Sequence, residues 1–236
     1  MRILITNDDG IEADGIIRLA KAALKFGEVW VVAPSGQRSA SSHSITLRTS
    51  IEVCRADFPV EGVEAFAISG TPADCVRVGV RALLPQKPDL ILAGINYGYN
   101  VGTDVQYSGT IGAAMEGMFQ GIRSVAFSEG TEGKPDITDE YLEKLLAEAI
   151  DMPVGELEIV SVNIPAVSRE EFKGILRDRT VSRNFVFDDH YEKKDASEGK
   201  ASYMVAGEFC DHAEDKSDLR AVLDGYISIG RVRNIG

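Results

Sequence analysis

The chain opens with Arg2-Ile3-Leu4-Ile5-Thr6-Asn7-Asp8-Asp9-Gly10, in which an apolar, β-branched run ends in an amide, two adjacent carboxylates and a glycine. This pattern predicts a buried strand that delivers charge to one edge of a sheet. In an open parallel sheet, ligands bind at the carboxyl ends of the strands. Two aspartates there repel each other unless a cation or a shared proton lies between them, and a hard divalent cation is the simplest explanation.

On an ideal strand, Asp8 and Asp9 would point to opposite faces, so both reach one ion only where the chain has already turned. Gly10 permits such a turn. The alternative interpretation assigns Asp9-Gly10 to an ordinary turn and Asp8 to the cap of the following helix, because turns favour Asp and Gly.

Alternating helix and strand patterns follow this opening. Apolar residues at 16, 19, 20, 23 and 24 predict a helix over residues 14–26, and residues 28–34 predict a second buried strand, which completes a βαβ unit. Further strands are predicted over residues 45–56, 63–68, 88–95, 124–128 and 157–164, and further helices over residues 72–83, 111–120 and 138–151. The rhythm indicates an α/β fold whose mostly parallel sheet has helices on both faces.

The alternation of predicted strands and helices ends after Pro165. Residues 166–229 combine short β-like runs with charged stretches, and no helical periodicity continues there. We therefore predict an α/β catalytic core over residues 1–165 and a C-terminal extension over residues 166–236. The extension is expected to form a β-hairpin arm outside the main sheet that packs on a neighbouring subunit before the chain returns to the core.

The composition of the chain limits the classes of molecule that it can bind. With 236 residues, 44% of them hydrophobic, the chain can bury the core of one large α/β domain. Its net charge of −12 argues against a nucleic-acid polymer or an anionic membrane as a partner. No apolar run is as long as a membrane span and no signal segment precedes the first strand, so we expect a cytoplasmic protein. The scattered cysteines, Cys54, Cys75 and Cys210, predict packing thiols.

Two glycine-rich segments add polar groups near the same sheet edge. Residues 94–102 follow a predicted strand, and there Asn96 offers a neutral oxygen to a cation while Asn100 offers a donor to a phosphate oxygen. Ser108-Gly109-Thr110 leads into a helix, whose N-terminal N–H groups and neighbouring hydroxyls attract an anion. The plainer interpretations are a Gly/Asn loop and an ordinary Ser/Thr helix cap.

A third segment, residues 36–44, is a loop rich in Ser and Gly. Arg38-Ser39 could bring a cation and a hydroxyl ligand to the same rim, although such loops are usually only solvated. Specificity would lie in this loop and in the arm. The three histidines, His43, His190 and His212, are expected at the surface, and one from the arm remains a candidate general acid.

These segments resemble motifs of the survival protein E (SurE) family of metal-dependent nucleotidases. The resemblance rests on Ile-Leu-Ile-Thr-Asn-Asp-Asp-Gly at 3–10, Ala-Pro at 33–34 with Arg-Ser at 38–39, Gly-Thr-Pro-Ala-Asp-Cys-Val at 70–76, Gly-Ile-Asn-Tyr-Gly-Tyr-Asn-Val-Gly at 94–102 and Asp-Val-Gln-Tyr-Ser-Gly-Thr at 104–110. The pieces run in the family's order over about the first 130 residues. At the C-terminal end, Gly225-Tyr226-Ile227-Ser228-Ile229 departs from the family by continuing into Gly230-Arg231 rather than Thr-Pro.

The resemblance implies a Rossmann-like α/β domain with an arm exchanged between the subunits of a homodimer or homotetramer. It implies divalent-metal-dependent hydrolysis of nucleoside monophosphates: a 5'-nucleotidase, with 3'-nucleotidase and exopolyphosphatase activity left open. One Mg²⁺ or Mn²⁺ per subunit would be bound by Asp8, Asp9, Ser39 and Asn96. The substrate phosphate would be bound by Asn100, Ser108, the Gly109 N–H and Thr110, and Asp9 would orient or deprotonate the attacking water, with an aspartyl-phosphate route as the alternative.

Other phosphate-handling classes fit the pattern less well. A receiver domain would place its acceptor aspartate after residues 88–92, where Ala93 and Gly94 stand. A haloacid-dehalogenase-like phosphatase needs two aspartates with one residue between them, whereas Asp8 and Asp9 are adjacent. A protein that binds a nucleotide or metabolite without turnover remains an alternative, since sequence shows a site without showing a reaction.

Overall fold

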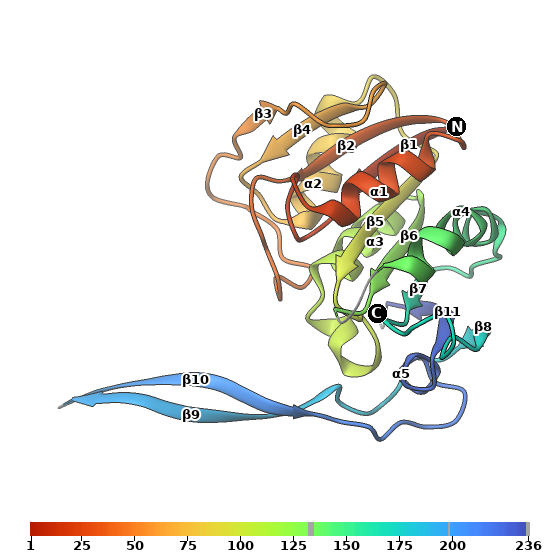
Figure 1. Cartoon of the computed structure of the whole chain (residues 1–236). Helices are drawn as coiled ribbons and strands as arrows, with labels where there is room; N and C mark the ends of the chain where they lie inside the picture. The colour runs from red at the N-terminus through yellow and green to blue at the C-terminus, as the bar shows by residue number, and fades with distance from the viewer. Residues whose placement is uncertain (132–134, 198, 235–236) are drawn as a thin grey trace.

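A nine-stranded sheet organises the chain in a computed structural model that describes residues 1–131, 135–197 and 199–234. The strand order is β3-β4-β2-β1-β5-β6-β7-β11-β8. Pairing is parallel from β4 through β7, and β3 and β11 pair antiparallel with β4 and β7 (Figure 1). The bounds are β1 Arg2–Thr6, β2 Glu28–Pro34, β3 Val53–Arg55, β4 Glu64–Ile68, β5 Leu90–Tyr97, β6 Arg123–Glu129, β7 Glu158–Ile164, β8 Gly174–Arg179 and β11 Tyr226–Arg233.

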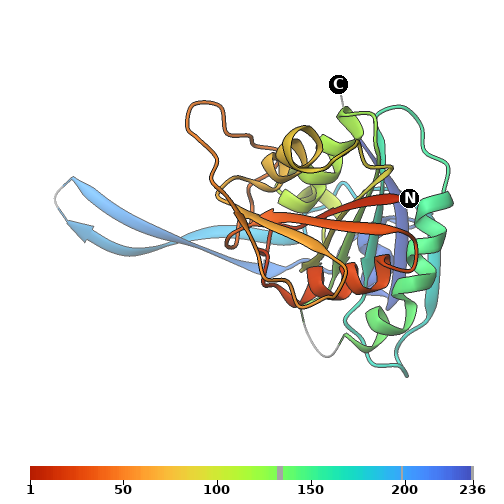
Figure 2. The ribbon, with the colours of Figure 1, turned by 90° about the horizontal axis from the view of Figure 1, so that it is seen from above.

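Helices cover both faces of this sheet, as predicted (Figure 2). The helices α1 (Asp14–Ala23) and α4 (Asp136–Asp151) pack with Ile3, Ile5 and their neighbours into one hydrophobic core. On the opposite face, α2 (Pro72–Val78), its π-helical continuation η1 (Gly79–Leu83) and α3 (Gly109–Phe119) pack with Leu4 and its neighbours into a second core. Alternate residues of β1 therefore face opposite cores, which explains why nearly the whole strand is apolar.

The hairpin predicted for the C-terminal extension is present. It consists of β9 (Phe187–Ser197) and β10 (Lys200–Phe209), whose residues are almost all exposed, and it projects away from the rest of the molecule (Figure 1). The extension also contains β8 and β11, two strands of the main sheet that the sequence pattern did not predict. β11 supplies buried residues such as Ile227 and Ile229 to the core shared with α1 and α4.

The short helix α5 (Asp218–Leu223) also lies in the extension, where no helix was predicted. With six residues it is too short to show a periodicity. Its Asp218 accepts backbone hydrogen bonds from Ser182 at 2.9 Å and from Gly102 at 3.2 Å, and burial raises the pKa of this carboxyl to about 6.

The predicted strand over residues 45–56 is mostly wrong, since only β3 forms there. Leu47 is 79% exposed, and the backbone N–H and hydroxyl of Thr46 bond Asp74 instead of a neighbouring strand. The segment is a loop tied to the N-terminus of α2. Among the helices in the described ranges, none is both long enough and apolar enough to span a membrane.

Candidate active site

Asp8 and Asp9 lie in a turn directly after β1, as the cation-site interpretation requires. The Asn7 side chain closes this turn: its Nδ2 donates to the Gly10 carbonyl at 2.8 Å and its Oδ1 accepts from the Gly10 N–H at 3.2 Å. Gly10 has a φ of +103°, which favours glycine. Asp8 does not cap the following helix, because the residue before α1 is Ala13 and no side chain caps it.

Asp8 is buried against the start of α3. The Thr110 hydroxyl donates to its Oδ1 at 2.6 Å. Burial and the neighbouring charge of Asp9 raise the pKa of Asp8 to about 6, against the lowering effect of the Thr110 hydrogen bond. A Cβ on Gly109 would lie 2.9 Å from the Asp8 Cβ and 2.6 Å from the Ser41 Oγ, so only glycine fits here. The carboxylate therefore lies directly against the helix N-terminus.

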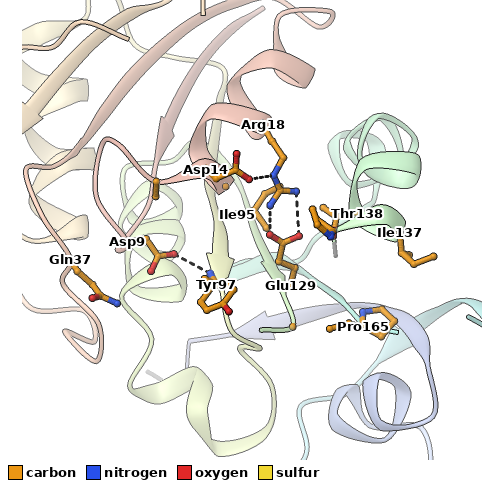
Figure 3. Close-up of a pocket in the computed structure, with 15 residues that line it drawn as sticks. Asp9, Asp14, Arg18, Gln37, Ile95, Tyr97, Glu129, Ile137, Thr138 and Pro165 are labelled. Carbon is orange, nitrogen blue, oxygen red and sulfur yellow. Dashed lines mark hydrogen bonds and ion pairs between the residues drawn. The ribbon is translucent and has the colours of Figure 1, made fainter. Parts of the chain in front are cut away.

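Asp9 is half-buried and points toward β5, where its Oδ2 accepts the Tyr97 backbone N–H at 3.0 Å (Figure 3). Burial raises its pKa, with a further contribution from the charge of Glu129. Asp9 lines a cavity of about 420 Å³, in which Arg18 pairs with Glu129 and with Asp14. The hydrogen bond from Tyr97 thus holds one oxygen of Asp9, which follows β1, against the end of β5.

Asp8 lines a second cavity, of about 760 Å³, which shares Tyr97 with the first. Five of the predicted site residues line this second cavity: Asp8, Ser39, Asn96, Asn100 and Ser108. They come from the ends of β1 and β5, the loop after β2 and the residue before α3. The parallel sheet therefore gathers side chains that are up to 100 residues apart in the sequence.

The oxygen donors of this region have the chemistry that a hard divalent cation prefers. The Asn96 Nδ2 donates to the Gly98 carbonyl at 2.8 Å, which leaves Asn96 Oδ1 without a hydrogen bond from any described residue. Asp9 Oδ1 likewise accepts no hydrogen bond from a described residue, because the Tyr97 N–H donates to the other oxygen, Oδ2. Within the described ranges, no three His, Cys, Asp or Glu side chains form a metal-binding group, so hydroxyl and amide oxygens would have to complete the set.

The three side chains predicted to bind phosphate each have a hydrogen-bond partner within the protein. Ser108 caps α3, since its Oγ accepts the Ile111 N–H at 3.0 Å. Asn100 donates through Nδ2 to the Ser128 Oγ at 2.8 Å, and its own backbone N–H is bound by Asn163. Thr110 is fully buried and donates to Asp8, so its hydroxyl positions the carboxylate.

The loop that carries Ser39 is attached to α3 and to the segment just before it by contacts that the sequence did not indicate. Ser42 donates through its N–H to the Tyr107 carbonyl at 2.9 Å and through its Oγ to the Gln106 carbonyl at 2.7 Å. His43 stacks on Phe119 and bonds Glu116 at 3.0 Å. Among the described residues, the buried Ser41 Oγ has no hydrogen-bond partner, and it lies beside Gly109.

The expectation that Arg38 brings a cation to the rim is wrong, because its guanidinium donates to the Ser69 carbonyl at 2.9 Å and does not line the cavity. His190 and His212 are exposed, and neither lines the cavity. Ser39 does line it, with its Oγ accepting from Gln37 at 2.9 Å. The cysteines are free, and Cys54 is exposed rather than packed.

Comparison with known proteins finds one family over most of the chain. The family model of survival protein SurE matches residues 3–186. A curated 5'-nucleotidase SurE from a Synechococcus species is 43% identical over 240 residues, which covers 97% of this chain and 90% of that protein. A second, from Thermosipho africanus, is 38% identical over 232 residues with the same coverage of both chains.

A solved structure gives the same result for the fold. The crystal structure of the SurE protein from Aquifex aeolicus superposes with a TM-score of 0.82 at 35% sequence identity. The match covers 99% of this chain and 93% of that one. The similarity therefore includes the C-terminal extension as well as the α/β core.

Proposed function

The chain belongs to the SurE family of survival proteins, and from this premise we propose that it hydrolyses nucleoside monophosphates to nucleosides and inorganic phosphate. It is a phosphoric monoester hydrolase. The observation that carries the proposal is the cavity at the ends of β1 and β5, which is lined by Asp8, Ser39, Asn96 and Ser108, the residue before α3.

Asp8, Asp9, Ser39 and Asn96 would bind one divalent cation, Mg²⁺ or Mn²⁺. When bound, such a cation stabilises the charge that spreads over a transferring phosphoryl group and lowers the pKa of a water molecule. A bound cation would also offset the burial of Asp8 and the nearby charge of Asp9, which together raise the pKa of Asp8 to about 6. The unused oxygens of Asn96 and Asp9 support this ligand set.

The protein groups would position the ester for in-line attack. The Ser108 hydroxyl, the Gly109 N–H and the second amide hydrogen of Asn100 would donate to phosphate oxygens at the helix N-terminus. Asp9, fixed by Tyr97, would orient the attacking water or accept its proton. An aspartate nucleophile is the alternative, and a phosphorylated aspartate trapped during turnover would decide in its favour. Thr110, predicted to contact phosphate, would act by positioning Asp8.

Cellular and quaternary properties follow from the same premise. We propose that the enzyme acts in the cytoplasm and assembles into homodimers or homotetramers through the hairpin. Exposed apolar side chains on β10, including Tyr203, Met204 and Val205, support a partner on this arm. Arm exchange between subunits remains a prediction, as does the boundary at residue 165.

The proposed function is tested by measuring phosphate release from a panel of nucleoside 5'- and 3'-monophosphates with Mg²⁺, with Mn²⁺ and with EDTA. We expect turnover with either metal and loss of turnover in EDTA that added Mn²⁺ restores. Binding of nucleotides without any release of phosphate would identify a binding protein instead. Undiminished release in EDTA would contradict the metal dependence.

Replacing Thr110 with valine is expected to weaken Mn²⁺ binding on the order of tenfold near pH 6, because it removes a hydrogen bond to the ionised carboxylate. Only ionised Asp8 binds a cation, so affinity falls as pH falls through its pKa of about 6. Without the Thr110 hydroxyl that pKa rises, and the loss of affinity begins at higher pH.

The measurement is a Mn²⁺ titration of the valine variant at several pH values, with Thr110→Ser as the matched control that keeps the hydroxyl. We expect the serine variant to follow the parent protein. An unchanged pH dependence in the valine variant would show that Thr110 does not tune Asp8.

A further inference from the structure

The cavity that contains Asp8 has a second wall, which no step of the proposed hydrolysis uses. This wall consists of Phe185, Phe187, Asp188, Asp189 and Tyr191 at the root of the hairpin, and we call it the arm wall. The residues facing it include Asp104 and Tyr107, which lie in and just after η2 (Gly102–Gln106). A substrate whose phosphate lies at Asp8 would therefore place its remaining atoms between η2 and the arm wall.

The arm wall is held in place although the hairpin beyond it projects from the molecule (Figure 1). The Thr103 N–H donates to the Asn184 carbonyl at 3.3 Å, and a Cβ on Gly102 would lie 2.7 Å from that same oxygen. Val186 is buried in a small apolar cluster together with Val101. The segment that enters β9 thus packs directly on η2, which places the start of the arm wall against η2.

Aromatic side chains of this region are exposed to the cavity. Phe185 is 62% exposed, Tyr107 60% and Tyr191 71%. Rings that are this exposed have few packing contacts with the protein core. A nucleobase has an apolar face that stacks on such rings whichever base it is. The rings therefore fit the base of a nucleotide better than they fit an inorganic phosphate chain.

The charges of this cavity point to the same substrate. Its described lining contains the carboxylates of Asp8, Asp104, Asp188 and Asp189 and no Lys, Arg or His. Asp104 in η2 and Asp189 in the arm wall line the same cavity, and burial together with the charge of Asp189 raises the pKa of Asp104. Carboxylates accept hydrogen bonds from ribose hydroxyls and repel additional phosphate groups.

We propose that the arm wall, together with Tyr107, forms a nucleoside subsite that selects substrates with one phosphate and a base over nucleoside diphosphates and inorganic polyphosphate. This inference rests on the proposed function. Phe185 and Tyr107 stack on the base, and Asp188 and Asp189 accept hydrogen bonds from the sugar and exclude further phosphates. The hairpin root thus determines specificity, separately from the residues that act on the phosphate.

The test compares kcat/KM for adenosine 5'-monophosphate, ribose 5-phosphate, adenosine diphosphate and tripolyphosphate in the full-length protein. Phe185→Ala is expected to lower kcat/KM for the nucleoside monophosphate about tenfold through KM, and to change that for ribose 5-phosphate less than about twofold. The double variant Asp188→Asn, Asp189→Asn is expected to raise activity on tripolyphosphate relative to the monophosphate several-fold at low salt, with the gain fading as salt is added.

Leu47→Ala is the control, because Leu47 is a large apolar residue, 79% exposed, that lies outside the hairpin and does not line the cavity. It should leave all four kcat/KM values unchanged. Equal loss on both monophosphates in Phe185→Ala, or parent-like substrate ratios in the double variant, would overturn the subsite. If the parent protein released no phosphate from any of the four compounds, the proposed function itself would fail, which is a distinguishable result.

Discussion

Replacing Asp8 with asparagine is expected to lower phosphate release by about a thousandfold or more and to weaken Mn²⁺ binding in parallel. Asparagine has the same shape as aspartate and can still accept the Thr110 hydroxyl through one oxygen, so the fold around β1 should persist. What it lacks is the negative charge that is buried beside Asp9. The substitution therefore removes a charge for binding a cation without opening a cavity in the core.

Phosphate release and Mn²⁺ titration, with thermal unfolding as the check of the fold, measure this effect. Asp178→Asn is the matched control, because the Asp178 side chain is 74% exposed and pairs with Arg231 rather than with any residue predicted in the site. Asparagine also tolerates the positive φ of +54° at that position. Parent-like activity and metal dependence in the Asp8 variant would refute the site assignment.

Replacing Gly109 with alanine is expected to reduce activity about a hundredfold, because a displacement of reacting groups by about an ångström has an effect of this size. The new methyl group would lie 2.9 Å from the Asp8 Cβ and 2.6 Å from the Ser41 Oγ, so at least one of them must move. A shift of Asp8 also changes its distance from Asn96 and Ser39, so Mn²⁺ affinity should fall together with activity.

Gly36→Ala provides a matched control in the loop that carries Ser39. A Cβ on Gly36 would meet no heavy atom within 4 Å, and the residue is exposed. The comparison measures kcat/KM, Mn²⁺ affinity and unfolding for both alanine variants. Gly109→Ala with the activity of Gly36→Ala would show that close packing of Asp8 on α3 is unimportant for function.

Local patterns were enough to predict the α/β core. Strands such as β2 and helices such as α1 have apolar periodicities that arise within the element itself, and these determine where it packs. The position of Asp8 and Asp9 at a strand end was likewise readable, because a charged pair directly after a buried strand leaves few other arrangements. The family comparison confirms both the fold class and the resemblance.

Contacts between distant segments were not readable from such patterns. Thr110 lies 102 residues from Asp8, and nothing local distinguishes a hydroxyl that positions a carboxylate from one that contacts phosphate. β11 joins the sheet by pairing with β7, and β8 joins it by pairing with β11, although the long hairpin lies between the two strands in the sequence. The loop at Thr46 looked like a strand because its bonding to Asp74 is a tertiary feature.

The role of Asn7 could not be predicted from its position in the sequence. Its side chain closes the turn that carries Asp8 and Asp9, but an amide before two carboxylates can equally be a ligand or a turn residue. Asp8 and Asp9 also line different cavities. The two cavities are neighbours, because Tyr97 lines both of them. The central claim about this site is therefore that the two carboxylates bind the same ion.

That claim is tested directly by anomalous scattering, recorded at the manganese absorption edge from crystals grown with Mn²⁺. We expect one strong peak per subunit at the carboxyl ends of β1 and β5, within coordination distance of oxygen atoms from Asp8, Asp9, Ser39 and Asn96. A peak bound by other residues, or none at saturating Mn²⁺, would contradict the account.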